Sequence, residues 1–163
     1  MPADDYDDPA AHAATEEVLL LPSLSLADAV ELGLLALSLA RAAQLPVLVE
    51  VTRAGGVAFR AALPGTSPDN DAWAAAKTRA VLRYGHSTAW LRAHHRARGT
   101  TFEAATGFGV GEYAAHGGGF PLAVAGTGVV GVLVVSGLPQ ADDHAFVVDV
   151  LRRYLAGERA TLT

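Results

Sequence analysis

The chain has 163 residues, of which 51% are hydrophobic and 18% charged, and its formal net charge at pH 7 is −5. This length suits one domain with a sizeable core. The apolar fraction is high for a small monomer, which indicates a homo-oligomer that buries surface between subunits. No basic run is present, so nucleic acid is not an expected partner. The chain has no cysteine, which excludes disulfides, thiolate catalysis and iron–sulfur ligation.

The N-terminal segment, residues 1–17, carries six acidic residues and few large apolar side chains. This composition predicts a disordered acidic tail, with a single domain over 18–163. A secretory signal places positive charge at this end, so we expect a cytoplasmic protein. The apolar run over 18–26 is broken by Pro22 and is too short to span a bilayer, so no membrane association is expected.

Hydrophobic periodicity and turn residues predict the remaining elements in chain order. They are a helix over 26–44, strands over 47–53 and 57–63, helices over 71–84 and 88–98, strands over 120–125 and 129–136, and a helix over 142–156. Residues 129–136 are apolar on both faces, as in a central strand covered on both sides. Hairpins rather than crossovers join the strands. The sequence therefore predicts an α/β (α+β) fold, with a mainly antiparallel sheet of about five strands and helices on its faces.

The segment Gly126-Thr127-Gly128-Val129-Val130-Gly131 matches the spacing of a dinucleotide-binding loop. That loop functions only where it opens a helix, because the phosphate binds at the helix N-terminus. Here the segment precedes a run of Val and Leu, which predicts a hairpin turn. No nucleotide cofactor is expected.

A histidine followed by three glycines marks the strongest candidate site, with His116, Gly117, Gly118 and Gly119 running into Phe120. Glycine is retained where the backbone adopts positive φ or is approached closely, by a ligand or by another strand. In such a loop, His116 is suited to ligate a metal or haem iron, or to shuttle protons. The alternative is that His116 bonds a carbonyl and holds the loop.

Lys77 is the only lysine in a chain with eleven arginines, and it shares a helical stripe with Trp73. Burial would lower the pKa of this amine, suiting it to act as a base, a nucleophile or an anion anchor. The alternative is that the side-chain stem covers apolar surface while the amine reaches water. Trp73 and Tyr113 are interpreted as core residues or pocket walls.

Two other histidines are weaker candidates. His86 lies between two predicted helices and could join His116 across space, whereas the adjacent Ser87 is interpreted as a helix cap. His144 begins the last helix, where the helix dipole favours a neutral, ligating imidazole; the alternative is a capping or partly exposed residue. His94 and His95 point apart on one helix and are assigned to a solvated face. No metal-site spacing is present, so no structural metal is expected.

Several segments share their order and spacing with a known family. They are Ala61 to Thr66, Asp69-Asn70 with Trp73 and Lys77, Gly85-His86-Ser87, Glu112 to Pro121, and Gly131 to Gln140 with Asp143-His144. Over residues 20–157 they resemble the GlcG/HbpS-like haem-degrading family, specifically its cytoplasmic branch. The resemblance implies a profilin-like fold, higher oligomers, and haem or a related tetrapyrrole as the first ligand to test.

The resemblance also implies roles for particular residues. His116 would be an axial ligand or proton relay, Gly117 to Gly119 would let the ligand approach the backbone, and Lys77 would meet a propionate. The better-known haem-binding relatives are secreted, and the expectation of a cytoplasmic protein departs from them.

These observations lead to one main hypothesis, an oligomeric cytoplasmic protein that binds a small molecule. The alternative is a non-catalytic oligomeric scaffold or adaptor that binds another protein, which the apolar first helix and the acidic tail would suit. A hydrolase or other enzyme using Lys77 with His86 ranks below both, because no catalytic motif accompanies these residues.

Overall fold

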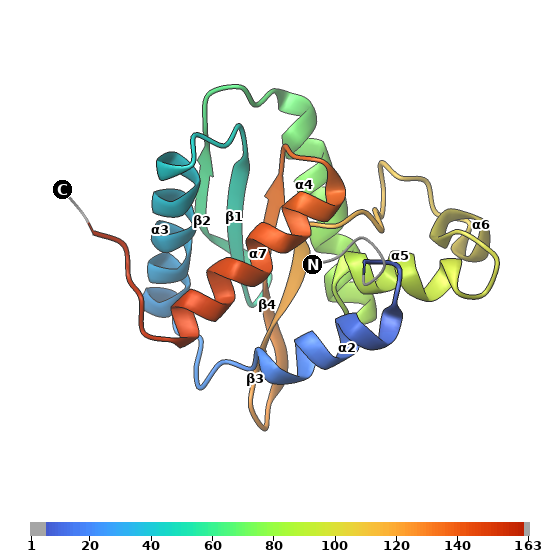
Figure 1. Cartoon of the computed structure of the whole chain (residues 1–163), viewed down its shortest axis with the longest axis horizontal. Coiled ribbons are helices and arrows are strands. Elements are labelled where there is room, and N and C mark those ends of the chain that lie inside the picture. The colour runs from blue at the N-terminus through green and yellow to red at the C-terminus, as the bar shows by residue number, and fades with distance from the viewer. Residues whose placement is uncertain (1–5, 162–163) are drawn as a thin grey trace.

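A four-stranded antiparallel sheet forms the centre of the computed structural model, which describes residues 6–161 (Figure 1). The strands are β1 (Leu48–Arg53), β2 (Gly56–Ala62), β3 (Gly119–Val124) and β4 (Gly128–Ser136), in the order β2-β1-β4-β3. All three pairings are antiparallel. The predicted α+β fold is therefore confirmed, with four strands in the described part of the chain where about five were expected.

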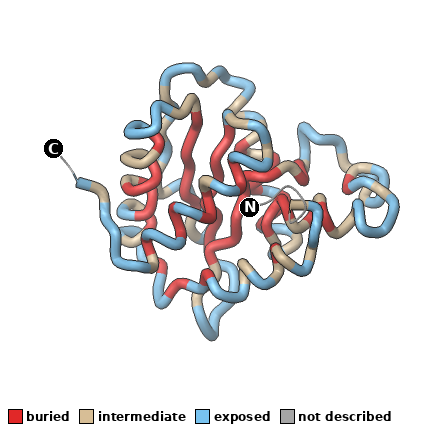
Figure 2. Tube along the Cα trace, in the orientation of Figure 1, coloured by how far each residue is buried: buried red, intermediate tan, exposed pale blue. Residues whose placement is uncertain are grey.

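Helices cover both faces of this sheet. Helices α3 (Leu26–Ala42) and α7 (Gln140–Leu155) pack on one face, and α4 (Pro68–Tyr84) packs on the other. Alternate residues of β1 divide between the two layers: Val49 and Val51 join the core under α3 and α7, while Leu48 joins the core under α4. Strand β4 divides in the same way, so its continuous apolar sequence reflects a central strand that is buried on both faces (Figure 2).

Local signals fix where the helices begin and end. Helix α4 begins at Pro68, earlier than predicted, because the Asn70 side chain accepts a hydrogen bond from the Ser67 backbone N–H at 2.9 Å and proline is tolerated in the first turn. It ends at Gly85, whose φ is +74°. Ser87 then caps α5 (Thr88–Arg96) by accepting a hydrogen bond from the Trp90 backbone N–H at 3.1 Å. The short helix α6 (Phe102–Thr106) follows.

The prediction of a disordered tail is wrong for residues 9–17, because they belong to helix α2 (Pro9–Val18). Asp8 caps this helix and accepts a hydrogen bond from the Ala10 N–H at 2.9 Å. The helix packs against α5, where Glu16 accepts a hydrogen bond from the Ser87 backbone N–H at 2.7 Å. Glu16, whose charge favoured a solvated tail, thus binds the start of another helix 71 residues later in the chain. The rest of the expected tail, residues 1–5, lies outside the described residues.

The glycine pattern at 126–131 is a hairpin turn, as predicted. Gly126 and Gly128 have φ values of +77° and +102°, and the segment joins β3 to β4. No helix starts there to receive a phosphate. Among the helices of residues 6–161, none is both long enough and apolar enough to cross a membrane.

Candidate functional site

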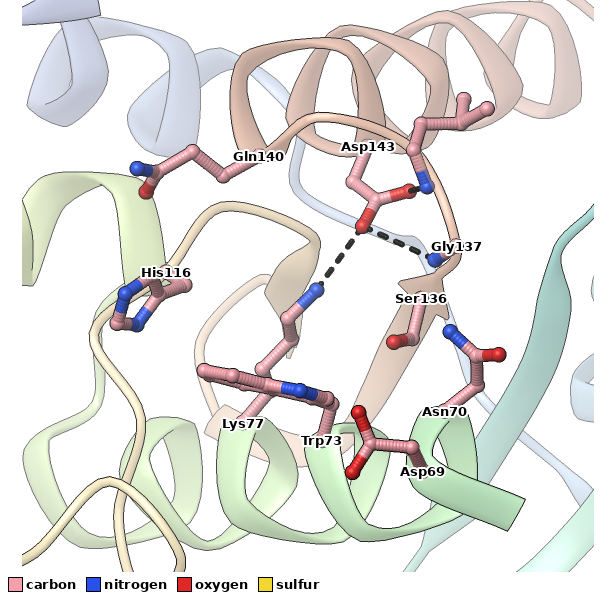
Figure 3. A pocket seen from close by; sticks show the side chains of 10 residues that line it. Asp69, Asn70, Trp73, Lys77, His116, Ser136, Gly137, Gln140 and Asp143 are labelled. Carbon is pink, nitrogen blue, oxygen red and sulfur yellow. Dashed lines mark hydrogen bonds and ion pairs between the residues drawn. The ribbon is translucent and has the colours of Figure 1, made fainter. Parts of the chain in front are cut away.

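A pocket of about 300 Å³ lies where α4 faces the turn between β4 and α7 (Figure 3). Its lining comes from the first half of α4, the end of β4, the start of α7 and the loop before β3. The lining residues are Asp69, Asn70, Trp73, Lys77, His116, Ser136, Gly137, Leu138, Gln140 and Asp143. Spacing of four residues along α4 places Asp69, Trp73 and Lys77 on one helix face. The pocket therefore combines one aromatic wall with many polar groups.

A buried ion pair between Lys77 and Asp143 forms part of this wall. Lys77 Nζ lies 3.0 Å from Asp143 Oδ2 and donates a second hydrogen bond to the Val135 carbonyl, also at 3.0 Å. The two side chains are only 4% and 2% exposed. Asp143 also accepts hydrogen bonds from the backbone N–H groups of Leu138 at 3.0 Å and Gly137 at 3.4 Å. The carboxylate thus holds both the amine and the turn that leads into α7.

Burial shifts both members of the pair toward their neutral forms. Desolvation lowers the pKa of Lys77, and the nearby Asp143 carboxylate offsets only part of that effect. Desolvation likewise raises the pKa of Asp143, against the attraction of Lys77 and the backbone hydrogen bonds. Proton transfer from the ammonium to the carboxylate is therefore less unfavourable here than in water.

His116 stands at the edge of the pocket with its ring edge-to-face against Trp73, at 4.9 Å between ring centroids. Its Nδ1 is buried and has no hydrogen-bond partner among the described residues. Burial lowers the pKa of His116, so the ring is neutral at pH 7 and one of its two nitrogens carries a lone pair. A second hollow of about 230 Å³ also has His116 and Gln140 in its lining, together with Arg92 and Arg96.

The three glycines beside His116 make room for the protein's own groups. A Cβ on Gly118 would lie 2.4 Å from the Val135 carbonyl oxygen and 2.8 Å from Lys77 Nζ, and the φ of Gly118 is +123°. A Cβ on Gly117 would lie 2.2 Å from the Gln140 carbonyl oxygen, and one on Gly119 would lie 3.0 Å from Thr88 Cγ2. The expectation that these glycines let a ligand approach the backbone is thus replaced by close packing of β3, α4 and α7.

His144 lies away from the pocket, under α2. It is 2% exposed, and its ring meets that of His12 edge-to-face at 4.7 Å between centroids. Neither nitrogen of His144 has a partner among residues 6–161. Burial, followed by the neighbouring His12, lowers the pKa of His144 to about 3. The alternative of a capping or partly exposed residue is therefore wrong, and His144 is a neutral core histidine.

The remaining predicted site residues also lie outside the two hollows. His86 Nδ1 lies 2.7 Å from Glu16 Oε2, and the His86 ring stacks on Trp90 at 3.8 Å between centroids, so it does not join His116. Tyr113 packs against Phe108 at 4.5 Å between ring centroids. Phe120 is a buried residue of the main core. Of the residues chosen from the sequence, the structure brings together Trp73, Lys77 and His116.

Five polar lining residues were not selected from the sequence as site residues: Asp69, Asn70, Ser136, Gln140 and Asp143. The sequence contains an indirect signal for Asp143, because a lysine on an apolar stripe needs a carboxylate partner if it is buried. The sequence does not show which of the 17 acidic residues supplies it.

The comparisons with known proteins agree on one family. The family described as haem degrading protein HbpS-like matches residues 24–152. A UPF0303 protein of Streptomyces avermitilis is 49% identical over 142 residues, which make up 87% of this chain and 87% of the relative. A UPF0303 protein of Streptomyces coelicolor is 52% identical over 128 residues, 78% and 81% of the two chains.

The chain belongs to the HbpS-like haem-degrading protein family. Solved structures share the fold of this HbpS-like protein. The crystal structure of Ybr137w protein superposes with a TM-score of 0.81 at 25% identity, covering 93% of this chain and 90% of that one. The complex of PduOC with haem gives 0.66 at 22% identity, covering 80% and 94%. HbpS itself gives 0.63 at 22% identity, covering 83% and 94%.

Proposed function

We propose that this HbpS-like protein binds haem or a related tetrapyrrole, with His116 as the iron ligand. The observation that carries the proposal is the state of the His116 ring. The ring is neutral at pH 7 and belongs to the lining of two hollows. A neutral imidazole of this kind is the protein ligand that haem iron most often uses. The family and its haem-bound structural relative support the same ligand class.

The surrounding residues fit the group, with one change from the sequence-based expectation. The Lys77 ammonium is already paired with Asp143, so it is not free to meet a propionate. Arg92 and Arg96 are better placed for carboxylates, because they line the hollow next to His116 and share the single carboxylate of Asp7. Trp73 offers an aromatic surface beside the ring. Bound haem would supply a redox-active iron, which the side chains alone do not provide.

Volume limits how the ligand would lie. The two hollows measure about 300 and 230 Å³, at or below the lower end of the roughly 300–1,000 Å³ typical of small-molecule sites. A macrocycle would therefore use both hollows and stay partly open to solvent or to a second subunit.

The test is a haemin titration followed by Soret absorbance, with His116→Ala and His94→Ala measured in parallel. His94 is a matched control, since it lies on α5 outside both linings, stacked on Trp90. We expect a saturable, shifted Soret band in the wild type and in His94→Ala, and its loss in His116→Ala. An unchanged band in His116→Ala would contradict the assigned ligand, and a titration equal to the buffer blank would contradict haem binding.

We further propose that the protein is a homo-oligomer. Large apolar side chains remain open in the single chain, with Val18, Leu26 and Val57 exposed by 71%, 61% and 59%. Covering these side chains between subunits would remove apolar surface from water. Light scattering during size-exclusion chromatography measures the mass directly, and a mass equal to one chain at micromolar concentration would contradict this proposal.

A further inference from the structure

Lys77 is the only side-chain amine of the protein, and it is buried. Eleven positions carry arginine, yet this one carries lysine, 3% exposed, in the lining of the pocket. An ammonium and a guanidinium both carry positive charge, but only the amine gives up its proton readily enough to become a nucleophile. Position 77 thus holds the one side chain of the molecule that is capable of amine chemistry.

Stability alone does not explain the ion pair between Lys77 and Asp143. Taking an ammonium and a carboxylate out of water costs free energy that their attraction often fails to recover, and well-packed apolar residues serve as well or better. The pair also requires the positive-φ glycine at 118, which is a further conformational cost. A role for the free amine would explain why such an arrangement is kept.

The neighbours of Lys77 supply what an amine nucleophile needs. Asp143 Oδ2 lies 3.0 Å from Nζ, within the distance at which it can accept the ammonium proton and later return it. The backbone N–H groups of Gly137 and Leu138 hold this carboxylate in place. Figure 3 shows the Lys77 side chain rising behind the Trp73 ring to meet Asp143.

The composition of the pocket selects a chemical class of ligand. Its lining holds one ammonium and two carboxylates, those of Asp69 and Asp143, so an anionic ligand is disfavoured. Ser136, Asn70 and Gln140 provide hydroxyl and amide groups that match the hydroxyls of a ligand. The volume of about 300 Å³ lies at the lower end of the roughly 300–1,000 Å³ typical of small-molecule sites, so the ligand is small.

We propose that Lys77 captures a small, uncharged hydroxyaldehyde as an imine, with Asp143 as the proton acceptor and donor. This second ligand class does not rest on the haem proposal, since it uses Nζ of Lys77 and not the ring of His116, although both ligands would occupy the same pocket and exclude one another.

The step balances without a further reactant. The ammonium passes a proton to Asp143, and the Nζ lone pair attacks the carbonyl carbon, so that a C–N bond forms and the C=O π bond breaks. A proton moves from nitrogen to oxygen to give the neutral carbinolamine. Asp143 then protonates the hydroxyl, water leaves, and the nitrogen lone pair forms the C=N bond. The product is a protonated imine next to the Asp143 carboxylate, so that the original ion pair is restored.

The experiment traps this imine in the wild-type protein. Glycolaldehyde is added at pH 7 with cyanoborohydride, which reduces an imine to a stable secondary amine, and peptide mapping by mass spectrometry locates the label. The α-amine serves as the reference, because Lys77 is the only other amine in the sequence. The same reaction in guanidinium chloride gives the behaviour of the unfolded chain.

The expected ratio follows from the free-amine fractions. At pH 7 an ordinary lysine has roughly several-hundred-fold less free amine than an α-amine, so the unfolded chain is labelled almost only at its α-amine. In the folded protein we expect the ratio of Lys77 label to α-amine label to rise at least tenfold. A ratio equal to or below that of the unfolded chain would overturn the proposal. Because this comparison needs no variant, it does not depend on whether a Lys77 substitution folds.

A second probe tests the charge class. Glyoxylate, which carries a carboxylate, is expected to label Lys77 less than glycolaldehyde does when each is scaled to the α-amine. A higher scaled label with glyoxylate would overturn the assignment to uncharged aldehydes. In Lys77→Met, the total label is expected to fall to that of the α-amine, and an unchanged total would show that the captured aldehyde is held elsewhere.

Discussion

Replacing the buried His144 by phenylalanine should make the protein markedly less sensitive to acid. The neutral ring of His144 lies among His12, Tyr6 and Phe120, with Asp143 as its neighbour on α7. Its pKa is about 3 in the folded protein and about 6.5 when unfolded, so acid protonates the unfolded chain first. Its contribution is therefore fully present above pH 6.5 and is lost as the pH falls toward 3.

The size of the effect follows from the two pKa values. Between pH 7 and pH 5 the folded His144 stays neutral while the unfolded one becomes charged, which removes about 2 kcal/mol from the free energy of unfolding. In His144→Phe this loss disappears. At pH 7 the variant should be as stable as the wild type or about 1 kcal/mol more stable, because two nitrogens without partners among the described residues are removed.

Urea unfolding at pH 7 and pH 5, followed by tryptophan fluorescence and far-ultraviolet circular dichroism, measures both quantities. His94→Phe is the matched control, since His94 stacks on Trp90 near the surface and should keep most of the wild-type fall in stability. The reasoning would be refuted if wild type and His144→Phe lost the same free energy of unfolding between the two pH values. A loss in His94→Phe as small as in His144→Phe would refute it too.

Three further tests by chemical unfolding at pH 7 examine the packing around the site and the contact between α2 and α5. Gly118→Ala places a methyl group 2.8 Å from Lys77 Nζ at a φ of +123°, and should cost at least about 2 kcal/mol; wild-type stability would contradict the close approach. Asp143→Leu alone should cost about 3–5 kcal/mol, whereas the double variant with Lys77→Met should recover most of that loss. Equal losses in the single and double variants would show that the charge left unpaired is not the cause. Glu16→Ala removes the carboxylate that accepts a hydrogen bond from the Ser87 N–H and should lower the free energy of unfolding by about 1–2 kcal/mol. A change below about 0.3 kcal/mol would contradict the role of Glu16 in capping the start of α5.

Local sequence signals were sufficient for the sheet and for most helices. In β1 and β4, successive side chains are buried alternately on the two faces of the sheet. Because this pattern repeats every second residue, a short stretch of sequence is enough to reveal it. Helix α2 could not be found in this way. Two side chains of α2 hold it in place: Glu16 accepts a hydrogen bond from the Ser87 N–H at the start of α5, and the ring of His12 packs against that of His144. Ser87 and His144 lie far from α2 in the sequence.

The candidate site shows the same division. Lys77 and His116 are candidates because each is unusual in its own segment, and Trp73 is predicted as a core residue or pocket wall; the structure places all three in one pocket lining. His86 and His144 were selected on the same kind of evidence but occupy other environments. A histidine has the same local signature in a pocket, beside a carboxylate or in a core, because these settings differ only in the tertiary contacts of the ring.

The lone lysine and the middle glycine of the triplet, two separate anomalies in the sequence, have one common cause. Lys77 Nζ reaches Asp143 across the end of β4, and the path of the chain at Gly118 leaves no space for a Cβ beside that amine. A side chain at this position would displace the amine from its carboxylate. The positive φ of Gly118 favours glycine as well. Gly118 is therefore better explained by the buried amine than by a ligand on the backbone. This makes Lys77 as central to the pocket as the histidine that first marked it.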